Sequence, residues 1–370
     1  SSVNRMFEDL GGAERFVKKG DRVFLKINLV IKKKPEAAAT THPAVVEAVA
    51  RRLVDAGAEV IIGDSPGGPY NRSVLQSMYR VCGIEGAAER SGAKLNFDCT
   101  SAEYRHPEGV AVKRLTLAKP MMDCDRIITI SKLKTHGMVR YSGAVKVMYG
   151  AIPGMLKTEY HLKMSNIKNF TNLLVDICTL AKPCLSIIDG VVGMEGSGPT
   201  AGSPVQSSVI FASESPYDID VVGAYLIGIK PESVPTVRRS MERGLTAGSI
   251  GDIGIVGDRV DKYRKSYKMP PARTENFSEK IPAFADRFVK RHILQRPVFS
   301  QELCVGCGTC RDSCPPGAIE MKGGRPVVAV DKCIRCFCCQ ELCPRKAVSI
   351  IRPWNISGIL RNLRFHKHNI

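Results

Sequence analysis

Alternating apolar and polar segments define the first part of the chain. Residues 22–30 form a nearly continuous apolar run, and residues 58–64 form a second one. Runs of this length predict buried strands. Between them, apolar residues recur at helical spacing after Pro43, and Thr41 or His42 stands where a helix cap is expected. A strand–helix–strand unit of this kind predicts a parallel sheet with right-handed crossovers.

The same patterns continue for about two thirds of the chain. Further strands are predicted at 94–97, 110–117, 127–130, 184–188 and 208–212, and helices at 165–181 and 216–229. A glycine-rich loop at 193–204 fits neither the G-x-G-x-x-G pattern nor a Walker loop, and a strand follows it rather than a helix. We therefore expect an α/β fold over residues 1–257, in one lobe or two, with a largely parallel sheet and flanking helices.

Cysteines dominate the C-terminal part. Residues 304–315 and 333–344 both read C-x₂-C-x₂-C-x₃-C-P, the run of two-cluster bacterial ferredoxins, in which the fourth cysteine of each run binds the other cluster. This spacing predicts two [4Fe–4S] clusters in a ferredoxin-like domain at 299–352. The first cluster would be held by Cys304, Cys307, Cys310 and Cys343, and the second by Cys333, Cys336, Cys339 and Cys314.

Zinc sites and disulfides are the alternatives for these cysteines. Zinc modules pair C-x₂-C units across long spacers and do not repeat three cysteines at consecutive two-residue gaps. A disulfide framework is typical of short secreted chains, and the first residues here show no secretory pattern. Cys338 lies between two predicted ligands and is interpreted as a thiol that binds no cluster.

Charge narrows the range of partners. The 370 residues carry a net charge of +18, spread over both parts of the chain. This favours an anionic small molecule or an acidic redox protein. Aromatic residues make up only 6% and no nucleic-acid-binding motif occurs, which argues against nucleic acid. A basic linker is predicted at 258–298 and a basic tail at 353–370; no apolar run reaches membrane-span length. Cluster cysteines predict a reducing, oxygen-poor cytoplasm.

Polar residues gather where the predicted strands end. Lys26 and Asn28 share one face of the first strand, and Asp64 ends the second. If residues 132–136 stay extended, Lys132, Lys134 and His136 share a face as well. Two cations beside an imidazole suit an anionic ligand at the carboxyl edge of a sheet. The alternatives are a turn-forming aspartate and a solvated basic loop.

Several of these strings resemble those of the domain-of-unknown-function family 362. The resemblance spans about residues 10–350 and rests on Lys26-Ile-Asn28, the strings at 40–43, 63–67, 131–136, 143–150 and 196–202, and Asp189-Gly190. It implies a prokaryotic iron–sulfur protein of anaerobic metabolism, often fused to a two-cluster ferredoxin, with no agreed substrate. The family tends to have Asn after the lysine of the 143–150 string; Val147 here weakens the case for Lys146.

Two functions of different class follow. In the first, an iron–sulfur oxidoreductase passes low-potential electrons to an anionic substrate at the edge of the α/β domain. His136, Lys134, Lys132 and Asp64 would be catalytic, with His136 supplying a proton, and Lys26, Asn28, Gly196 and Gly198 would bind a cofactor or substrate. In the second, an electron-transfer subunit docks a redox partner and has no catalytic site. A third hypothesis is a nucleic-acid-binding or structural protein in which clusters act as staples. The sequence identifies no flavin or other organic cofactor, and no oligomeric state.

Overall fold

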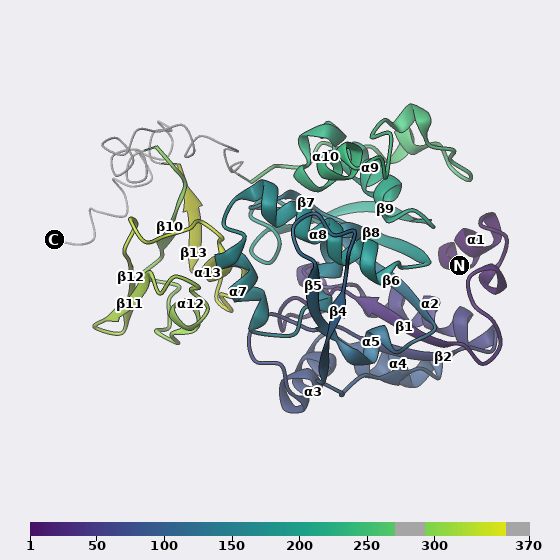
Figure 1. Cartoon of the computed structure of the whole chain (residues 1–370), viewed down its shortest axis with the longest axis horizontal. Coiled ribbons are helices and arrows are strands. Elements are labelled where there is room, and N and C mark those ends of the chain that lie inside the picture. Colours follow the sequence, from purple (N-terminus) through teal and green to yellow (C-terminus); the bar gives the residue numbers. More distant parts are fainter. Residues whose placement is uncertain (271–292, 353–370) are drawn as a thin grey trace.

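The computed structural model describes residues 1–270 and 293–352. Residues 271–292 of the predicted basic linker, and the predicted basic tail at 353–370, lie outside the described residues. Figure 1 shows an α/β domain with a smaller module, formed by the last described residues, at one end of it, while helix α1 (Ser2–Asp9) lies toward the other end.

The central sheet of the described chain has seven strands in the order β3–β2–β1–β6–β8–β9, with β7 paired to β6. The strands are β1 (Arg22–Ile27), β2 (Glu59–Gly63), β3 (Lys94–Leu95), β6 (Arg126–His136), β7 (Arg140–Ser142), β8 (Leu185–Glu195) and β9 (Ser203–Ser213). The pairs from β3 to β8 are parallel. Only β7 and β9 pair antiparallel within this sheet. The expected α/β fold with a largely parallel sheet is confirmed.

Helices cover both faces of the sheet. Helices α1, α2 (Pro43–Asp55), α3 (Arg72–Val81) and α4 (Ile84–Ser91) form one apolar core with alternate residues of β1. The second core contains α5 (Lys119–Met122), α6 (Ala144–Val147), α7 (Leu156–Lys163) and α8 (Ile167–Ala181). A third joins α9 (Pro216–Leu226) and α10 (Pro235–Glu242) to β8 and β9. Because both faces are covered, the strands are apolar on both sides.

The chain departs from the predicted elements at three places. β6 runs on through His136, so the predicted strand at 127–130 is only its first part and residues 132–136 are extended, as the shared-face hypothesis requires. β8 and β9 pair almost to their tips, which shortens the predicted 193–204 loop to residues 196–202. The strand predicted at 110–117 is β5 (Arg114–Ala118), which pairs with β4 (Ser101–Arg105) outside the central sheet.

The C-terminal module consists of two similar halves. Strand β10 (Arg296–Phe299) pairs with β13 (Val348–Ile351), and β11 (Ile319–Lys322) pairs with β12 (Arg325–Val328). A short helix follows the first cysteines of each run: α12 (Thr309–Asp312) and α13 (Cys338–Glu341). Helix α13 lies on the side of the module that contacts the α/β domain.

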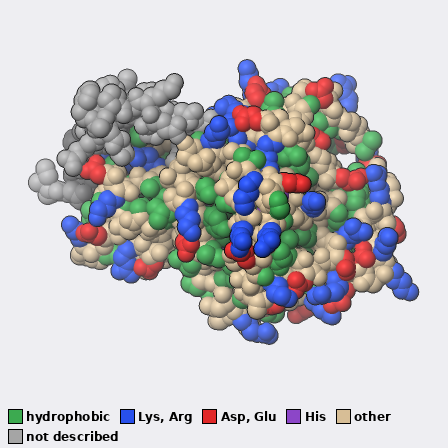
Figure 2. Space-filling view, in the orientation of Figure 1, with side chains coloured by type: hydrophobic (Ala, Val, Ile, Leu, Met, Phe, Trp, Pro, Cys, Tyr) green, Lys and Arg blue, Asp and Glu red, His purple; other side chains and the backbone are tan. Residues whose placement is uncertain are grey.

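Charged side chains are mixed over the face of the molecule in Figure 2. Lys and Arg side chains are spread across this face, with Asp and Glu among them. The excess positive charge is therefore not gathered into one basic stripe on the face in view, as the electrostatic footprint of a nucleic-acid-binding surface would require. In the described part of the chain, no helix is both long and apolar enough to cross a bilayer.

Candidate functional site

A buried ion pair joins the carboxyl ends of β1 and β2. Lys26 Nζ lies 2.8 Å from Asp64 Oδ1, and the two side chains are only 1% and 4% exposed. The other carboxylate oxygen of Asp64 accepts a hydrogen bond from the Leu29 amide at 2.7 Å. A Cβ on Gly150 would lie 2.2 Å from Asp64 Oδ1 and 2.5 Å from Lys26 Nζ, so only glycine fits against this pair. The Lys26–Asp64 pair therefore packs directly against Gly150 at the carboxyl ends of β1 and β2.

A second buried pair joins β6 to β8. Lys132 Nζ lies 2.6 Å from Asp189 Oδ2, and neither side chain is more than 1% exposed. Lys132 also donates to the Val192 carbonyl, while Asp189 accepts from the amide of His42 at 2.9 Å, which fixes the start of α2. The contacts of the Lys132 ammonium group are thus with residues of the neighbouring strand β8. Lys132 does not line the cavity between the α/β domain and the C-terminal module, and its catalytic role stays a prediction.

Lys134 is hydrogen-bonded to Asn28, the residue that follows β1. Its ammonium group donates to Asn28 Oδ1 at 2.6 Å and to the Ala39 carbonyl at 2.7 Å. Burial, helped by the charge of Lys146, lowers the pKa of Lys134 to about 7. Both hydrogen-bond acceptors are uncharged, so the proton on Lys134 is held loosely at neutral pH.

His136 lies at the end of β6, against the C-terminal module. Its Nδ1 accepts a hydrogen bond from the Met138 amide at 3.1 Å, and its Nε2 lies 3.3 Å from Oε1 of Glu341. Burial and the charges of Lys146 and Lys134 hold the pKa of His136 well below its usual value. The ring is therefore neutral at neutral pH, with its hydrogen on the Nε2 that faces Glu341. That His136 supplies a proton stays a prediction; in the structure its Nε2 faces the carboxyl group of Glu341.

A cavity of about 70 Å³ lies between the α/β domain and the C-terminal module; we call it the junction cavity. From the α/β domain, Asn28, Asp64, Lys146 and Lys157 line it, together with the loop that follows β2. Helix α13 closes it with Cys338 and Glu341, and Leu342 follows. Two predicted site residues, Asn28 and Asp64, are on its wall. Lys26, Lys134 and His136 stand directly behind that wall.

Three residues of this wall were not predicted. The sequence pattern weakens the case for Lys146 because Val147 follows it, and Glu341 lies in the spacer between Cys339 and Cys343, which the cluster motif leaves undefined. Lys157 occurs in no motif. Its ammonium group donates to Ser65 Oγ at 3.1 Å and to the carbonyls of Pro66 and Ile152. The glycine at 150, in the same string as Lys146, was the one signal in the sequence that could have found this wall.

The predicted cluster ligands stand around two small cavities of the C-terminal module. One is lined by the first ring, Cys304, Cys307, Cys310 and Cys343, and the other by the second ring, Cys314, Cys333, Cys336 and Cys339. Apolar side chains complete both walls. The chain thus brings Cys314 to the second ring and Cys343 to the first, the exchange that two-cluster ferredoxins use. In the described residues, no three His, Cys, Asp or Glu side chains converge on a point suited to a single metal ion. Four thiols around a shared cavity fit a four-iron cube.

Cys338 belongs to neither ring. It lies between Cys336 and Cys339 in sequence, but it lines the junction cavity, and it is 5% exposed. A hydrogen bond with Cys336, together with burial, raises the pKa of the Cys338 thiol. Helix α13 therefore presents one cysteine to the second ring and another to the junction cavity within a single turn.

The loop at 196–202 holds the two parts together. Thr200 Oγ1 donates to the Glu341 carbonyl at 2.8 Å, and Lys346 donates to the Gly202 carbonyl at 3.2 Å. Gly196 accepts from Thr135, and a Cβ on Gly198 would lie 2.0 Å from the Thr135 carbonyl oxygen. Neither Gly196 nor Gly198 lines the junction cavity. The structure thus places these glycines in a loop that contacts the C-terminal module, and a cofactor-binding role for them stays a prediction.

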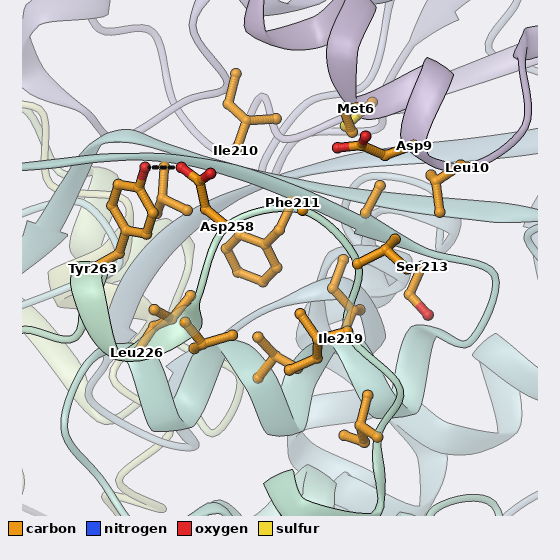
Figure 3. A pocket seen from close by; sticks show the side chains of 18 of the residues that line it. Met6, Asp9, Leu10, Ile210, Phe211, Ser213, Ile219, Leu226, Asp258 and Tyr263 are labelled. Carbon is orange, nitrogen blue, oxygen red and sulfur yellow. Dashed lines mark hydrogen bonds between the residues drawn. The ribbon is translucent and has the colours of Figure 1, made fainter.

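A larger cavity, of about 480 Å³, lies elsewhere and is shown in Figure 3. It is enclosed by α1, β9, α9 and the segment at 253–263, and Asp258 accepts a hydrogen bond from Tyr263 at its rim. Phe211, Ile219 and Leu226 point into it. None of the predicted site residues and no residue of the C-terminal module lines it. Its size is that of a ligand site, but the polar chemistry and the cysteines lie at the junction cavity.

Comparison with known proteins agrees with both halves of this description. Residues 23–225 match the family described as "Domain of unknown function (DUF362)", and residues 296–344 match a 4Fe-4S dicluster domain. The chain is 32% identical over 251 residues to the thylakoid-associated protein sll1697 of Synechocystis sp., covering 66% of this chain and 75% of that protein. It is 37% identical over 54 residues to NADH-quinone oxidoreductase subunit I 1 of Solibacter usitatus, covering 15% of this chain and 32% of that protein.

Among solved structures, the lactate racemase apoprotein from Thermoanaerobacterium thermosaccharolyticum is similar at 14% identity with a TM-score of 0.32, over 57% of this chain and 51% of that one. The chain thus spans about half of that structure, and a likeness of this size carries no functional argument. The family match covers more than half of the chain, and the cyanobacterial relative is covered over three quarters of its length. The chain therefore belongs to the family described as domain of unknown function 362, joined here to a 4Fe-4S dicluster domain.

Proposed function

We propose that this protein is an iron–sulfur oxidoreductase that passes low-potential electrons from two [4Fe–4S] clusters to an anionic substrate in the junction cavity. The observation that carries the proposal is the position of α13. Cys339 of this helix belongs to the second ring, and Cys338 and Glu341 line the cavity. Helical residues rise about 1.5 Å each, so these residues span only about 5 Å along the axis. A ligand in the cavity would sit close to the second ring.

The clusters would supply one-electron chemistry at low potential when bound. The protein's own residues supply the remainder of the site. Reducing an unsaturated or oxidised group by two electrons consumes two protons and builds negative charge on the way. Lys146 and Lys157 on the cavity wall, with Lys134 behind Asn28, place positive charge there. The α/β domain and α13 enclose the cavity together, which keeps bulk water from most of its wall.

Convergence of the polar residues favours this function over an electron-transfer subunit without a catalytic site. A docking surface for a protein partner is broad, whereas Asn28, Asp64 and Lys146 surround a cavity beneath the C-terminal module. A reducing, oxygen-poor cytoplasm remains part of the proposal, because a reducing compartment keeps cysteine thiols available as ligands.

Re-oxidation of the reduced protein tests the proposal. The protein is reduced with dithionite under anaerobic conditions, freed of excess reductant and mixed with small oxidised carboxylates or with oxidised acidic redox proteins. The loss of the reduced-cluster EPR signal is then followed. Re-oxidation by a small anion, with release of its reduced product, supports the proposal. Re-oxidation by redox proteins alone, with every small anion inert, would instead identify an electron-transfer subunit.

His136→Gln is expected to lower turnover at least about tenfold while both clusters remain. The physical reason is the 3.3 Å contact between His136 and Glu341, which fixes the carboxyl group on the cavity wall, and misplacement of a site residue by about 1 Å can cost about a hundredfold in rate. Turnover with the small anion found above, together with iron content, measures the effect. Lys163→Met on the outer face of α7 is the matched control. Full activity of His136→Gln would remove His136 from the site.

Anion affinity is expected to fall as the pH rises through about 7. Burial lowers the pKa of Lys157 to about 7, with Asp64 opposing and Lys26 and Lys146 adding to the shift. Below that pH the ammonium group is charged and attracts an anion; above it the amine is neutral. Calorimetric titration at several pH values measures the slope. In Lys157→Met the slope should flatten, and an affinity that rises with pH in the unaltered protein would contradict this role.

A further inference from the structure

Lys146 differs from the other lysines around the site. Lys26 and Lys132 are paired with carboxylates. Lys134 and Lys157 donate to amide, hydroxyl and carbonyl oxygens. Within the part of the chain that the structure describes, the Lys146 ammonium group makes neither a hydrogen bond nor an ion pair. Its nearest aromatic contact is the ring of Tyr149, whose centroid is 5.1 Å away.

The junction cavity limits what Lys146 can bind. Its volume is about 70 Å³, whereas pockets for organic cofactors and drug-sized ligands usually measure about 300–1,000 Å³. A molecule with only a few non-hydrogen atoms fits, and a flavin or a nucleotide does not.

The wall of the junction cavity is closely packed. Gly150 lets the Lys26–Asp64 pair close the floor, and a side chain there would collide with both charged groups. Gly67 lies against Leu342, where a Cβ would come within 2.9 Å of the leucine. Glu341, on the α13 side, is not within ion-pair distance of Lys146, and its Oε1 is held near His136. A space therefore remains between the lysine and the helix.

From this arrangement we infer that the junction cavity binds a small oxyanion, of the size of formate or bicarbonate, through the ammonium group of Lys146. Lys146 is half-buried, and a bound oxyanion would supply the opposite charge and the hydrogen-bond acceptors that its ammonium group lacks. Burial also lowers the pKa of Lys146, and the charge of Glu341 opposes this shift. The inference rests on the proposed function only in taking this oxyanion as the substrate or as part of it.

Calorimetric titration of the intact, cluster-loaded protein tests the inference. Sodium formate and sodium bicarbonate are the probes, sodium chloride at the same ionic strength is the charge control, and sodium benzoate is the size control. Lys146→Met removes the ammonium group with little loss of length. Lys163→Met is the matched control, because it removes a lysine of α7 that is 66% exposed and paired with Glu159 one turn earlier in the same helix.

We expect formate or bicarbonate to bind the unaltered protein and Lys163→Met alike, and to bind Lys146→Met at least about tenfold more weakly, since a hydrogen bond to a charged group accounts for about that ratio or more. Benzoate should not bind at the same site. Equal affinity of Lys146→Met and the unaltered protein, absence of binding by both oxyanions, or benzoate binding as tight as that of formate would each overturn the inference.

Two further readouts keep the result clear. If Lys146→Met loses its clusters or its fold, Lys146→Gln replaces it, with iron content and circular dichroism measured alongside. Weak oxyanion binding by the folded variant supports the inference. Full affinity in Lys146→Gln overturns it. Re-oxidation of the reduced clusters is measured separately. An oxyanion that binds through Lys146 but never re-oxidises the clusters contradicts the proposed function and leaves the binding site standing. Re-oxidation of the clusters by large substrates only would support the proposed function and contradict the oxyanion as its substrate.

Discussion

Cys336→Ala is expected to remove one of the two four-iron clusters, whereas Cys338→Ala keeps both. Cys336 lines the cavity of the second ring, and Cys338, two residues later, lines the junction cavity instead. Anaerobically reconstituted protein should contain about eight iron ions per chain, and Cys336→Ala about four. Iron and sulfide analysis, with EPR of the reduced protein, measures the change.

The first ring offers a matched comparison. Cys307→Ala should also halve the iron content, because Cys307 lines the other cavity with Cys304, Cys310 and Cys343. The EPR signal that survives in Cys307→Ala should be the one lost in Cys336→Ala. If Cys338→Ala damages a cluster as severely as Cys336→Ala does, the ligand register is wrong. A fully reconstituted protein that never exceeds about four irons would contradict the double assignment itself.

Lys132→Met is expected to destabilise the protein by about 3–5 kcal/mol, the range for removing one partner of a buried ion pair. Asp189 is 0% exposed and would keep a charge with only the amides of His42 and Val191 to compensate it. Chemical denaturation followed by far-ultraviolet circular dichroism under anaerobic conditions measures the loss. Both cluster signals should persist in the folded variant.

The double variant Lys132→Met/Asp189→Leu separates structural from functional roles for this pair. Replacing a buried ion pair by apolar residues of similar size is often nearly neutral, so the double variant should recover much of the lost stability. Lys163→Met, at an exposed pair, should change stability by less than about 1 kcal/mol. A Lys132→Met protein of normal stability that has lost anion binding would return Lys132 to the list of ligand-binding residues.

The sequence predicted the local elements well where apolar spacing and capping agreed. β1 buries Val23, Leu25 and Ile27 on one face and Phe24 on the other, which is why its buried residues are apolar except for Lys26. His42 accepts from the Ala44 amide ahead of Pro43, so the predicted start of α2 is confirmed. The extended segment through His136 follows from strand pairing with both β7 and β8.

Partners of the charged residues could not be predicted in the same way. Alternation places Lys132, Lys134 and His136 on one face, but it does not say which carboxylate or amide each one meets. Only the fold brings Asp189 to Lys132, Asn28 to Lys134 and Glu341 to His136. Glu341 lies more than 200 positions from His136 in sequence, in a spacer that the cluster motif leaves undefined. Lys157 belongs to no recognisable sequence motif.

The glycine-rich loop shows a different limit. Glycines permit close backbone approach, and the sequence cannot say whether a ligand or another part of the chain makes the approach. Here Thr135 and the C-terminal module make it. The predicted loop at 193–204 is also shorter than expected. Antiparallel pairing of β8 with β9 continues to Glu195 and Ser203 after a bulge near Gly190.

The reduction potentials of the two clusters in Lys146→Met test the central claim most directly, namely that the cavity of the α/β domain lies beside one cluster. A positive charge near a cluster stabilises its reduced form, so removing the ammonium group should make one midpoint potential more negative by some tens of millivolts and leave the other unchanged. Lys163→Met should shift neither. Anaerobic redox titration followed by EPR gives both potentials. If Lys146→Met shifts neither potential, or shifts both equally, the junction cavity is not the place where electrons leave the clusters.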